Sequence, residues 1–332
     1  MEVVFTECVS VTDQSSVGAA RRSALLAAQR LDFNELQSGE LALLATEASR
    51  NVLVHGGGGQ VVITGCRDHH HAAARILAMD KGPGIKDLAQ AIGDGYSTAG
   101  TMGGGMGAMK RIAGRLEIFS NRTGTIVMLQ VGTPEINGDL EIAGFALPYP
   151  GERHCGDAWV CDCTPERTMV LVVDGLGHGW EAAEAAQEAA STFRKRIQSA
   201  PGQILGYVHE ALRKTRGAVA AVTEIRLREG TLVYAGVGNI SAVVLNNGTS
   251  RSLVSHNGTL GIATSRIQEF KSEWPRGAVL IIHSDGLQSR WDLSSSSYPG
   301  LLARHPALIG GALLRDFRRQ RDDATVVVVK AA

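Results

Sequence analysis

The chain has 332 residues, of which 44% are hydrophobic and 20% are charged. This length and composition predict a protein of two domains, each with a core of ordinary size. Lys+Arg and Asp+Glu number 33 each, and this balance produces no bulk field that would favour nucleic acid or an anionic membrane.

Targeting signals and cysteine usage predict a cytoplasmic protein. No apolar run approaches the roughly 20 residues of a membrane span. The first residues, Met1 to Phe5, lack the basic region and cleavage site of a signal peptide. Five cysteines are an odd number, and Cys161 and Cys163 share a strand face without a histidine at ligand spacing, so we expect reduced thiols rather than disulfides or zinc.

The first part of the chain is predicted to form an α/β sandwich. Strands and helices alternate with apolar residues at the matching spacing. We expect strands at 3–9, 60–65, 74–80, 116–120 and 125–131, and helices at 17–31, 36–55 and 106–113. A stretch rich in turn residues, Gly-Thr-Pro-Glu-Ile-Asn-Gly, follows at 132–138 and marks a domain boundary. We therefore place the first domain at 1–133, a linker at 134–138 and the second domain at 139–332.

The second domain is richer in strands, and we expect helices outside antiparallel sheets. The predicted strands are 140–147, 158–163, 168–174, 218–227, 231–237, 240–245, 270–274, 279–283 and 325–330. The predicted helices are 180–197, 202–214 and 307–317. The fold class is thus α+β with two domains.

Three polar residues share one face of the helix predicted at 36–55. Glu47 and Asn51 are four residues apart, and His55 follows one turn later. A carboxylate beside a carboxamide suits a site for Mg²⁺ and a nucleotide, because the amide oxygen can bind the cation while the acid accepts a proton. On these residues alone, a merely solvated helix face explains the pattern equally well.

Two glycine-rich segments that follow favour the nucleotide site. Asp80 ends a strand before Gly82 and Gly84, where its carboxylate could accept a hydrogen bond from an adenine amino group. The glycines at 103, 105 and 107 open a helix whose free N–H groups suit phosphate, and Lys110 and Arg111 lie one turn further in.

Together these motifs resemble the N, G1 and G2 boxes of the GHKL ATP-binding fold, over about residues 1–133. Within that fold the match is similar to RsbT-like and SpoIIAB-like anti-sigma serine kinases, including Tyr96-Ser97-Thr98 in the lid. The resemblance implies that Asn51 ligates Mg²⁺, Glu47 activates a substrate hydroxyl, and Asp80 reads adenine. His69-His70-His71 lies between two strands and is interpreted as an exposed hairpin tip.

The second domain places several carboxylates beside apolar strands. Asp174 ends a strongly apolar run, within Asp-Gly-Leu-Gly-His-Gly, and further acids stand at Asp157, Asp285, Asp322 and Asp323. A single Asp-Gly pair is usually only a turn. Four such positions in one domain instead suit a pair of Mg²⁺ or Mn²⁺ ions that cleaves a phosphate ester.

This half resembles the metal-dependent protein phosphatases (PPM), in the SpoIIE and RsbX branch, over about residues 138–332. The resemblance implies an α-β-β-α sandwich. It also implies that Asp174 bridges two metals, that the Gly175 carbonyl joins it, and that Asp285 and Asp322 complete the second metal's shell. Asp157 would contribute directly or through water, and Asp323 is the less favoured ligand of its pair.

Three other residues near these motifs have weaker assignments. His178 could protonate a leaving serine oxygen, but we favour a packing role in the turn. Asn239, in the segment Ala-Gly-Val-Gly-Asn at 235–239, is interpreted as structural. Arg153 is a candidate phosphate contact on its position in the sequence alone.

The two resemblances together predict a bifunctional switch enzyme. One half would phosphorylate, and the other dephosphorylate, serine or threonine of a STAS-domain partner, such as an anti-sigma antagonist or a stressosome component. The alternative is a phosphatase whose ATP-binding domain is a regulatory module without kinase activity. Glu47 favours catalysis, because nucleotide binding requires Asn51 and the glycines but not a base. A third reading, an inactive scaffold, does not account for the complete set of acids.

Overall fold

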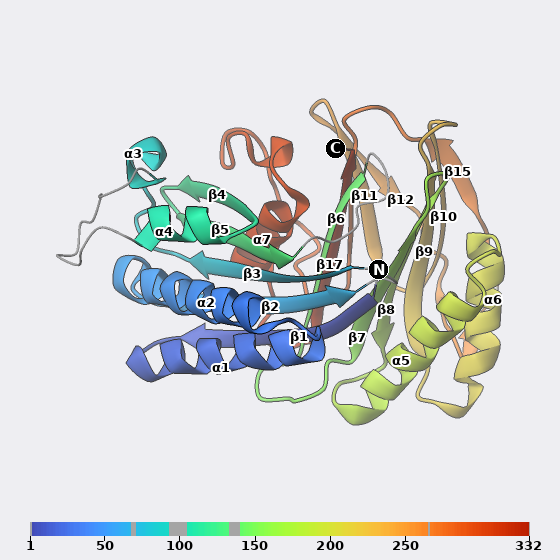
Figure 1. Ribbon diagram of the computed structural model, residues 1–332. Coiled ribbons are helices and arrows are strands. Elements are labelled where there is room, and N and C mark those ends of the chain that lie inside the picture. Colours follow the sequence, from blue (N-terminus) through green and yellow to red (C-terminus); the bar gives the residue numbers. More distant parts are fainter. Residues whose placement is uncertain (1, 68–70, 93–104, 133–139, 265, 332) are drawn as a thin grey trace. The chain divides into compact units, whose positions relative to one another are not determined.

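A computed structural model describes residues 2–67, 71–92, 105–132, 140–264 and 266–331 (Figure 1). Within these residues the chain divides into two compact units. The N-terminal unit contains residues 2–132 together with Ser295–Arg315, and the C-terminal unit contains 140–294 together with 316–331. The predicted linker at 134–138 lies outside the described residues.

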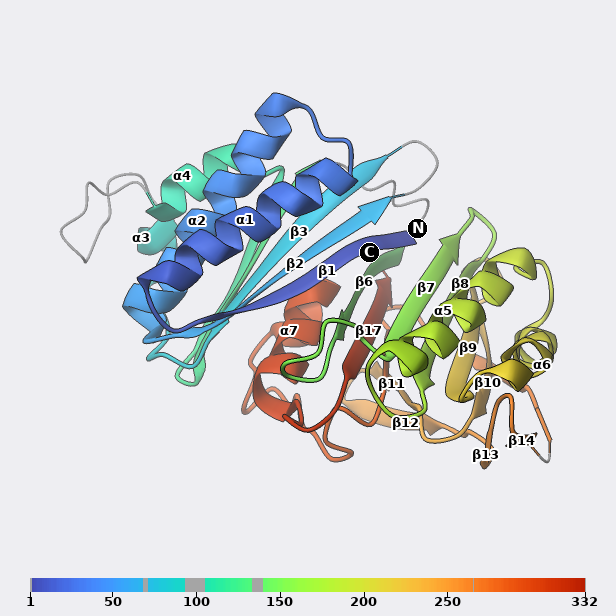
Figure 2. The ribbon, with the colours of Figure 1, turned by 90° about the horizontal axis from the view of Figure 1, so that it is seen from below.

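The N-terminal unit is built on one antiparallel sheet with the strand order β1-β2-β3-β5-β4. Its strands are β1 (Glu2–Val11), β2 (Gly59–Arg67), β3 (Ala72–Asp80), β4 (Arg115–Asn121) and β5 (Gly124–Gly132). Its helices before residue 133 are α1 (Gln14–Arg30), α2 (Glu35–Gly56), α3 (Leu88–Ile92) and α4 (Gly105–Ile112). Figure 2 shows α1 and α2 lying along the same face of this sheet.

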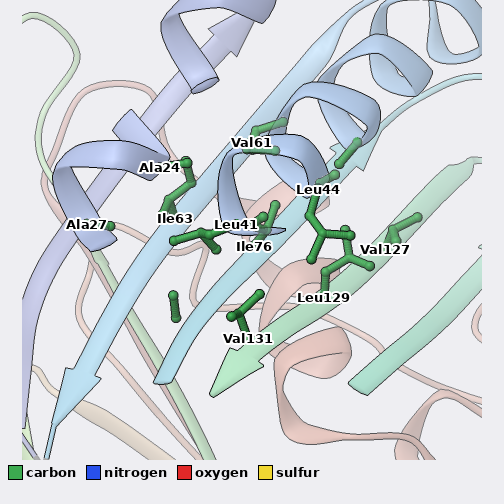
Figure 3. Packing of buried hydrophobic residues seen from close by; sticks show 14 of the residues in the cluster. Ala24, Ala27, Leu41, Leu44, Val61, Ile63, Ile76, Val127, Leu129 and Val131 are labelled. Carbon is green, nitrogen blue, oxygen red and sulfur yellow. The ribbon is translucent and has the colours of Figure 1, made fainter. Parts of the chain in front are cut away.

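Helices α1 and α2 cover one face of the sheet because their apolar residues meet alternate residues of the strands. Leu41 and Leu44 of α2 are fully buried against Ile63 of β2 and Ile76 of β3 (Figure 3). Leu129 of β5 belongs to the same cluster. Both helices begin at a capping box, with Asp13 before α1 and Asn34 before α2, which satisfies the first backbone N–H groups. The sequence therefore specifies where each helix begins.

The opposite face of this sheet is covered by a helix from far along the chain. Helix α7 (Pro306–Phe317) is buried from Pro306 to Arg315, and its residues through Arg315 belong to the N-terminal unit. A Cβ placed on Gly311 would lie 3.0 Å from Ile126 and 3.1 Å from Leu77. These two residues alternate with Ile76 and Val127 on the α1–α2 face, so they point to the other side of the sheet.

The C-terminal unit contains two five-stranded sheets. The first has the order β15-β10-β9-β8-β7 and the second the order β12-β11-β16-β17-β6. Their strands are β6 (Leu140–Leu147), β7 (Asp157–Cys163), β8 (Thr168–Gly175), β9 (Ala218–Arg226), β10 (Thr231–Val237), β11 (Ser241–Asn246), β12 (Thr249–Leu253), β15 (Phe270–Glu273), β16 (Val279–His283) and β17 (Ala324–Ala331). A short ribbon of β13 (Gly258–Thr259) and β14 (Ala263–Thr264) lies apart from both sheets.

Two helices pack on the first of these sheets. Helices α5 (Trp180–Lys195) and α6 (Pro201–Ala211) contact strands β7 to β10. Phe193 of α5 and Leu205 of α6 are fully buried with Leu171 and Val222 of the sheet. The short 3-10 helices Leu212–Lys214 and Leu301–Ala303 complete the helical segments that the structure describes.

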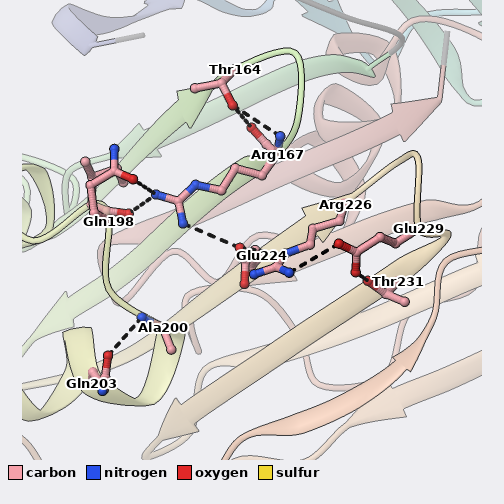
Figure 4. A network of polar contacts seen from close by, with 10 residues as sticks. Thr164, Arg167, Gln198, Ala200, Gln203, Glu224, Arg226, Glu229 and Thr231 are labelled. Atoms are coloured by element: carbon pink, nitrogen blue, oxygen red, sulfur yellow. Dashed lines mark hydrogen bonds and ion pairs between the residues drawn. The ribbon is translucent and has the colours of Figure 1, made fainter.

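A polar network ties the start of β8 to β9 and to the segment between α5 and α6. The Arg167 guanidinium donates to the side chain of Gln198 at 3.1 Å and lies 3.5 Å from Glu224 (Figure 4). Glu224 is only 3% exposed and also accepts a hydrogen bond from Arg226 at 3.0 Å. Because a buried carboxylate is costly unless it is paired, two arginines at Glu224 explain how the sheet tolerates it.

The predicted elements agree with the observed ones to within a few residues, and the α+β class is confirmed. No disulfide joins any of the five cysteines. No helix in the described part of the chain is long and apolar enough to cross a membrane. The sequence analysis did not anticipate that Ser295–Arg315 packs with the N-terminal unit.

Candidate functional site

Helix α2 carries the first group of predicted site residues. Glu47 and Asn51 are partly buried, and His55 is exposed in the last turn. The helix ends at Gly57, which adopts the left-handed conformation with φ 69°, as is usual for a glycine after a helix. The end of α2 thus leads directly into strand β2, which begins at Gly59.

Asp80 lies at the end of β3 and is 9% exposed. Its Oδ1 accepts hydrogen bonds from the backbone N–H of Gly82 at 2.8 Å and of Thr125 at 3.2 Å. These bonds hold the carboxylate in one orientation and are made by one of its two oxygens. The geometry suits an acid that receives a hydrogen bond from a ligand with its other oxygen.

Glycines let the end of α2 approach Asp80. A Cβ on Gly56 would lie 2.3 Å from the Cβ of Asp80, and a Cβ on Gly82 would lie 2.8 Å from the Cα of Gly56. Since real Cβ atoms do not approach so closely, both positions require glycine. The structure therefore brings the helix that carries Glu47 and Asn51 next to Asp80, although these residues are far apart in the sequence.

The remaining predicted nucleotide contacts are described only in part. Gly84 has φ 76°, and a Cβ there would lie 2.0 Å from the Asn121 carbonyl oxygen. Gly105 begins α4, Gly107 is buried, and Lys110 is exposed in the last turn. Helix α4 contacts α2. Gly103, the predicted lid at 96–98 and His69 and His70 lie outside the described residues.

In the C-terminal unit, Asp157 and Asp174 are partners on neighbouring antiparallel strands. Asp157 is the first residue of β7, and it stands opposite Asp174 near the end of β8. Asp157 is 4% exposed. Facing residues on adjacent strands have Cβ atoms about 5 Å apart, so two negative charges are held close together.

The second sheet adds Asp285 to the same end of the unit. Ser284 is fully buried, and its hydroxyl donates to Asp157 Oδ2 at 2.6 Å while accepting from the Thr325 N–H at 2.9 Å. The Asn239 side chain donates to Asp285 Oδ2 at 2.9 Å. Ser284 therefore links β7 to the segment that carries Asp285, and Asn239 orients the Asp285 carboxylate.

Asp322 and Asp323 precede β17 and differ in burial. Asp322 is partly exposed and Asp323 is 2% exposed. Asp323 Oδ1 accepts a hydrogen bond from the Tyr149 N–H at 2.7 Å, and its Oδ2 is buried without a hydrogen-bond partner among the described residues.

The electrostatics indicate a concentration of negative charge. Burial raises the pKa of Asp157 to about 7. Burial, followed by the charges of Asp157, Asp285, Asp322 and Asp323, raises the pKa of Asp174 to about 9. The pKa values of Asp322 and Asp323 are also raised, chiefly by burial. Since each carboxylate disfavours ionisation of the next, the cluster would be relieved by cations.

The donor set fits hard divalent cations, but the side chains do not form a closed shell as they stand. Carboxylate oxygens are the ligands that Mg²⁺ and Mn²⁺ prefer, and the orphaned Oδ2 of Asp323 is a buried acceptor without a donor. Across the described ranges, no three His, Cys, Asp or Glu side chains are placed to hold one metal ion together. The fit therefore rests on the donor chemistry and the mutual repulsion of the acids.

The turn after Asp174 is shaped by glycines and by a histidine. A Cβ on Gly175 would lie 2.2 Å from the Ala182 carbonyl oxygen, and Gly177 and Gly179 have positive φ. His178 Nδ1 lies 3.1 Å from Glu152 Oε1, and its ring stacks on Tyr149 with centroids 5.1 Å apart. These contacts agree with a packing role for His178. Arg153 is exposed in the same segment as Glu152.

Sequence reasoning identified the acids but not the groups that hold them. The roles of Ser284 in binding Asp157 and of the Tyr149 N–H in binding Asp323 were missed. A serine directly before Asp285 is a signal for the first. A backbone N–H leaves no signal in the sequence.

Two family models match the chain. The model described as stage II sporulation protein E (SpoIIE) matches residues 164–332, about half of the chain. The model described as a histidine kinase-like ATPase domain matches residues 11–131. The first range includes Asp174, Asp285 and Asp322, and the second includes Glu47, Asn51 and Asp80.

Individual proteins show the same division. The serine/threonine-protein kinase RsbT of Bacillus subtilis (strain 168) is 30% identical over 113 residues, covering 34% of this chain and 85% of RsbT. The phosphoserine phosphatase RsbX of the same strain is 25% identical over 161 residues, covering 48% of this chain and 79% of RsbX.

A solved structure described as "The bacterial stressosome: a modular system that has been adapted to control secondary messenger signaling" is also similar. It is 30% identical, with a TM-score of 0.53, and the match covers 57% of this chain and 99% of that chain. These similarities confirm an ATPase-like first part and a PP2C-like second part. The chain belongs to the SpoIIE family through its C-terminal PP2C-type phosphatase domain, and an RsbT-like histidine kinase-like ATPase domain precedes that domain.

Proposed function

We propose that the C-terminal unit is a metal-dependent phosphatase of phosphoserine or phosphothreonine in a protein. The observation that carries this proposal is the meeting of Asp157 and Asp174 on facing strands, next to Asp285, Asp322 and Asp323. The phosphoserine phosphatase RsbX, which shares this part of the sequence, supports the choice of substrate.

The chain's own residues would act by holding charge in place. A bound pair of Mg²⁺ or Mn²⁺ would supply charge neutralisation and a water of lowered pKa. We assign Asp174 with the Gly175 carbonyl, Asp285 and Asp322 as the ligands, and Asp157 as a ligand directly or through water. Ser284 and Asn239 keep Asp157 and Asp285 oriented through the hydrogen bonds described above.

We propose that the N-terminal unit is a serine/threonine kinase that uses ATP. Asp80 would accept a hydrogen bond from the adenine amino group, and Asn51 would ligate the Mg²⁺ that accompanies ATP. The N–H groups at the start of α4, with Lys110, would contact the phosphates. In the transfer, a bond forms between the substrate hydroxyl oxygen and the γ-phosphorus, the bond to ADP breaks, and Glu47 takes the hydroxyl proton.

Both activities would act on one partner, a STAS-domain protein such as an anti-sigma antagonist or a stressosome component. The support is that one chain combines parts similar to the kinase RsbT and the phosphatase RsbX. Fusion would fix the ratio of the two activities and raise the local concentration of each at a shared substrate.

A pair of variants tests the two assignments separately, with a purified STAS-domain protein as substrate. Glu47→Ala should abolish phosphate transfer from ATP while binding of ADP, measured by calorimetry, persists. Asp174→Asn should abolish Mn²⁺-dependent removal of phosphate from the phosphorylated substrate. Transfer that survives Glu47→Ala would refute the assignment of the base, and hydrolysis that survives Asp174→Asn would refute the metal site.

A second candidate function is a phosphatase regulated by a non-catalytic ATP-binding module. The observation that favours it is the packing of Ser295–Arg315, from the phosphatase part of the sequence, with the ATPase-like unit. The two functions differ in one result. A regulatory module binds ADP and changes phosphatase activity, but it transfers no phosphate to any STAS-domain protein.

A further inference from the structure

Helix α7 holds a buried arginine against the candidate nucleotide site. Arg315 is 8% exposed, and its Nη2 donates to Thr123 Oγ1 at 3.2 Å. Its Nη1 lies 3.5 Å from the carbonyl oxygen of Asp80, whose carboxylate we assign to adenine. Arg315 thus contacts both the end of β3 and the turn before β5.

The same helix ends within the segment that carries Asp285. The Phe317 carbonyl accepts a hydrogen bond from the Gln288 N–H at 2.9 Å, and the Arg319 N–H donates to the Gly286 carbonyl at 2.7 Å. Leu287 and Arg318 form a β-bridge between these bonds. The residues directly after α7 are therefore paired with the residues directly after Asp285.

Little chain separates the two sets of contacts. Arg315 and Phe317 lie in the last turn of α7, about 3 Å apart along the helix axis at a rise of 1.5 Å per residue. Because a helical turn does not stretch, a displacement of Arg315 is carried to Phe317 rather than absorbed between them. The contacts of Arg315 belong to the N-terminal unit, and those of Phe317 and Arg319 belong to the C-terminal unit.

We propose that α7 couples the nucleotide site to the phosphatase metal site, with Arg315 as the positioning residue. Binding of an adenine nucleotide at Asp80 fixes the end of β3, and through Arg315 and the last turn of α7 it fixes the hydrogen bonds of Gly286 and Gln288. Asp285 precedes these residues, so its readiness to bind a divalent cation depends on the nucleotide. By linkage, cation binding alters nucleotide affinity by the same factor. This inference rests on the two sites of the proposed function.

Amide hydrogen exchange tests the coupling without relying on activity. The full chain is compared with and without saturating ADP, at one constant millimolar Mg²⁺ concentration. The amides of Gly82 and Thr125, which bond to Asp80, report on the nucleotide site. The amides of Gln288 and Arg319 report on the end of α7, and we expect ADP to slow their exchange several-fold, because local opening is suppressed.

The variant Arg315→Met distinguishes coupling from general stabilisation. ADP should still protect Gly82 and Thr125 in this variant but leave Gln288 and Arg319 unchanged. The matched control Arg228→Met, at the exposed turn between β9 and β10, should behave as the wild type. If Arg315→Met fails to fold, Thr123→Ala removes one of the two Arg315 contacts and should weaken the effect at Gln288.

The possible outcomes separate this inference from the proposed function. Protection of Gly82 without any change at Gln288 and Arg319 in the wild type overturns the coupling and leaves the nucleotide site standing. Persistence of the Gln288 effect in Arg315→Met overturns the role of Arg315. Absence of protection at Gly82 removes the nucleotide site and the inference together.

Discussion

Asp157 and Asp174 stand directly opposite each other on β7 and β8, and each raises the cost of ionising the other. The pKa of Asp157 is raised to about 7 and that of Asp174 to about 9. A protein that spent no charge on function would gain stability by replacing either acid. This strain is expected of a cation site without its cations.

The first prediction follows from this repulsion. In metal-free buffer containing EDTA at pH 8, Asp174→Asn should raise the free energy of unfolding by about 1–3 kcal/mol, because it removes a buried charge among other acids. Thermal melting followed by circular dichroism measures the change. The control Asp162→Asn, on the same strand β7, should change stability little. A fall in the melting temperature of Asp174→Asn would contradict the assignment of repulsion.

The pH dependence of the metal-free protein gives a second prediction. A carboxyl whose pKa is raised on folding binds its proton more tightly when folded. Its stabilising contribution is complete below the ordinary value of 3.8 and is lost as pH rises through the folded pKa. The difference in stability between wild type and Asp174→Asn should therefore widen from pH 5 to pH 9. Saturating Mg²⁺ should abolish the widening, and a pH-independent difference would refute this prediction.

Ser284 supplies a third prediction, because its hydroxyl serves two buried groups. Ser284→Ala leaves Asp157 Oδ2 and the Thr325 N–H without this partner, and unsatisfied buried groups cost about 1–3 kcal/mol. Chemical denaturation should show that loss of stability in Mg²⁺-containing buffer. Ser252→Ala, on the exposed strand β12, is the matched control. Equal stability of the two variants would mean that the hydrogen bonds of Ser284 contribute nothing.

Two glycines with opposite surroundings give a fourth prediction. A Cβ on Gly144 of β6 would lie 2.4 Å from the Trp159 ring of β7, whereas a Cβ on Gly39 of α2 would meet nothing within 4 Å. Gly144→Ala should destabilise the protein by about 1–3 kcal/mol through overpacking. Gly39→Ala should stabilise it by about 0.5–1 kcal/mol, because alanine favours a helix. Denaturant midpoints test the pair, and a tolerated Gly144→Ala would contradict the close packing of β6 on β7.

Most strands and helices could be predicted from the sequence, and the exceptions have physical reasons. Strand β12 reads Thr-Ser-Arg-Ser-Leu and is mostly exposed at the edge of its sheet. Such a strand buries no apolar face, so it has no alternating pattern to recognise. Helix α3 has only five residues, too few to show a helical period.

The placement of α7 was missed even though the sequence contains a sign of it. Strands β3 and β5 are apolar almost without interruption, and both are buried along nearly their whole length. A sheet covered on one face alone shows alternation, whereas continuous apolar strands indicate cover on both faces. The sequence therefore indicates that something covers the second face, but only the structure identifies it as α7.

The candidate site divides in the same way. The acids could be predicted because each stands where an apolar strand meets a turn. The pairing of Asp157 with Asp174 depends on strand register, which the sequence does not specify for strands joined by so short a loop of turn residues. The contact of Arg315 with Asp80 joins residues 235 positions apart, and no local pattern announces it.

One time course tests the central claim, that this chain both installs and removes a phosphate, most directly. A purified STAS-domain protein is incubated with the full chain, Mn²⁺, Mg²⁺ and ATP labelled at the γ-phosphate, and its label is followed. We predict that the label rises and then falls with wild type as ATP is consumed, accumulates with Asp174→Asn, and never appears with Glu47→Ala. A substrate that acquires no label even with Asp174→Asn, from any STAS-domain protein of the source organism, would contradict the claim.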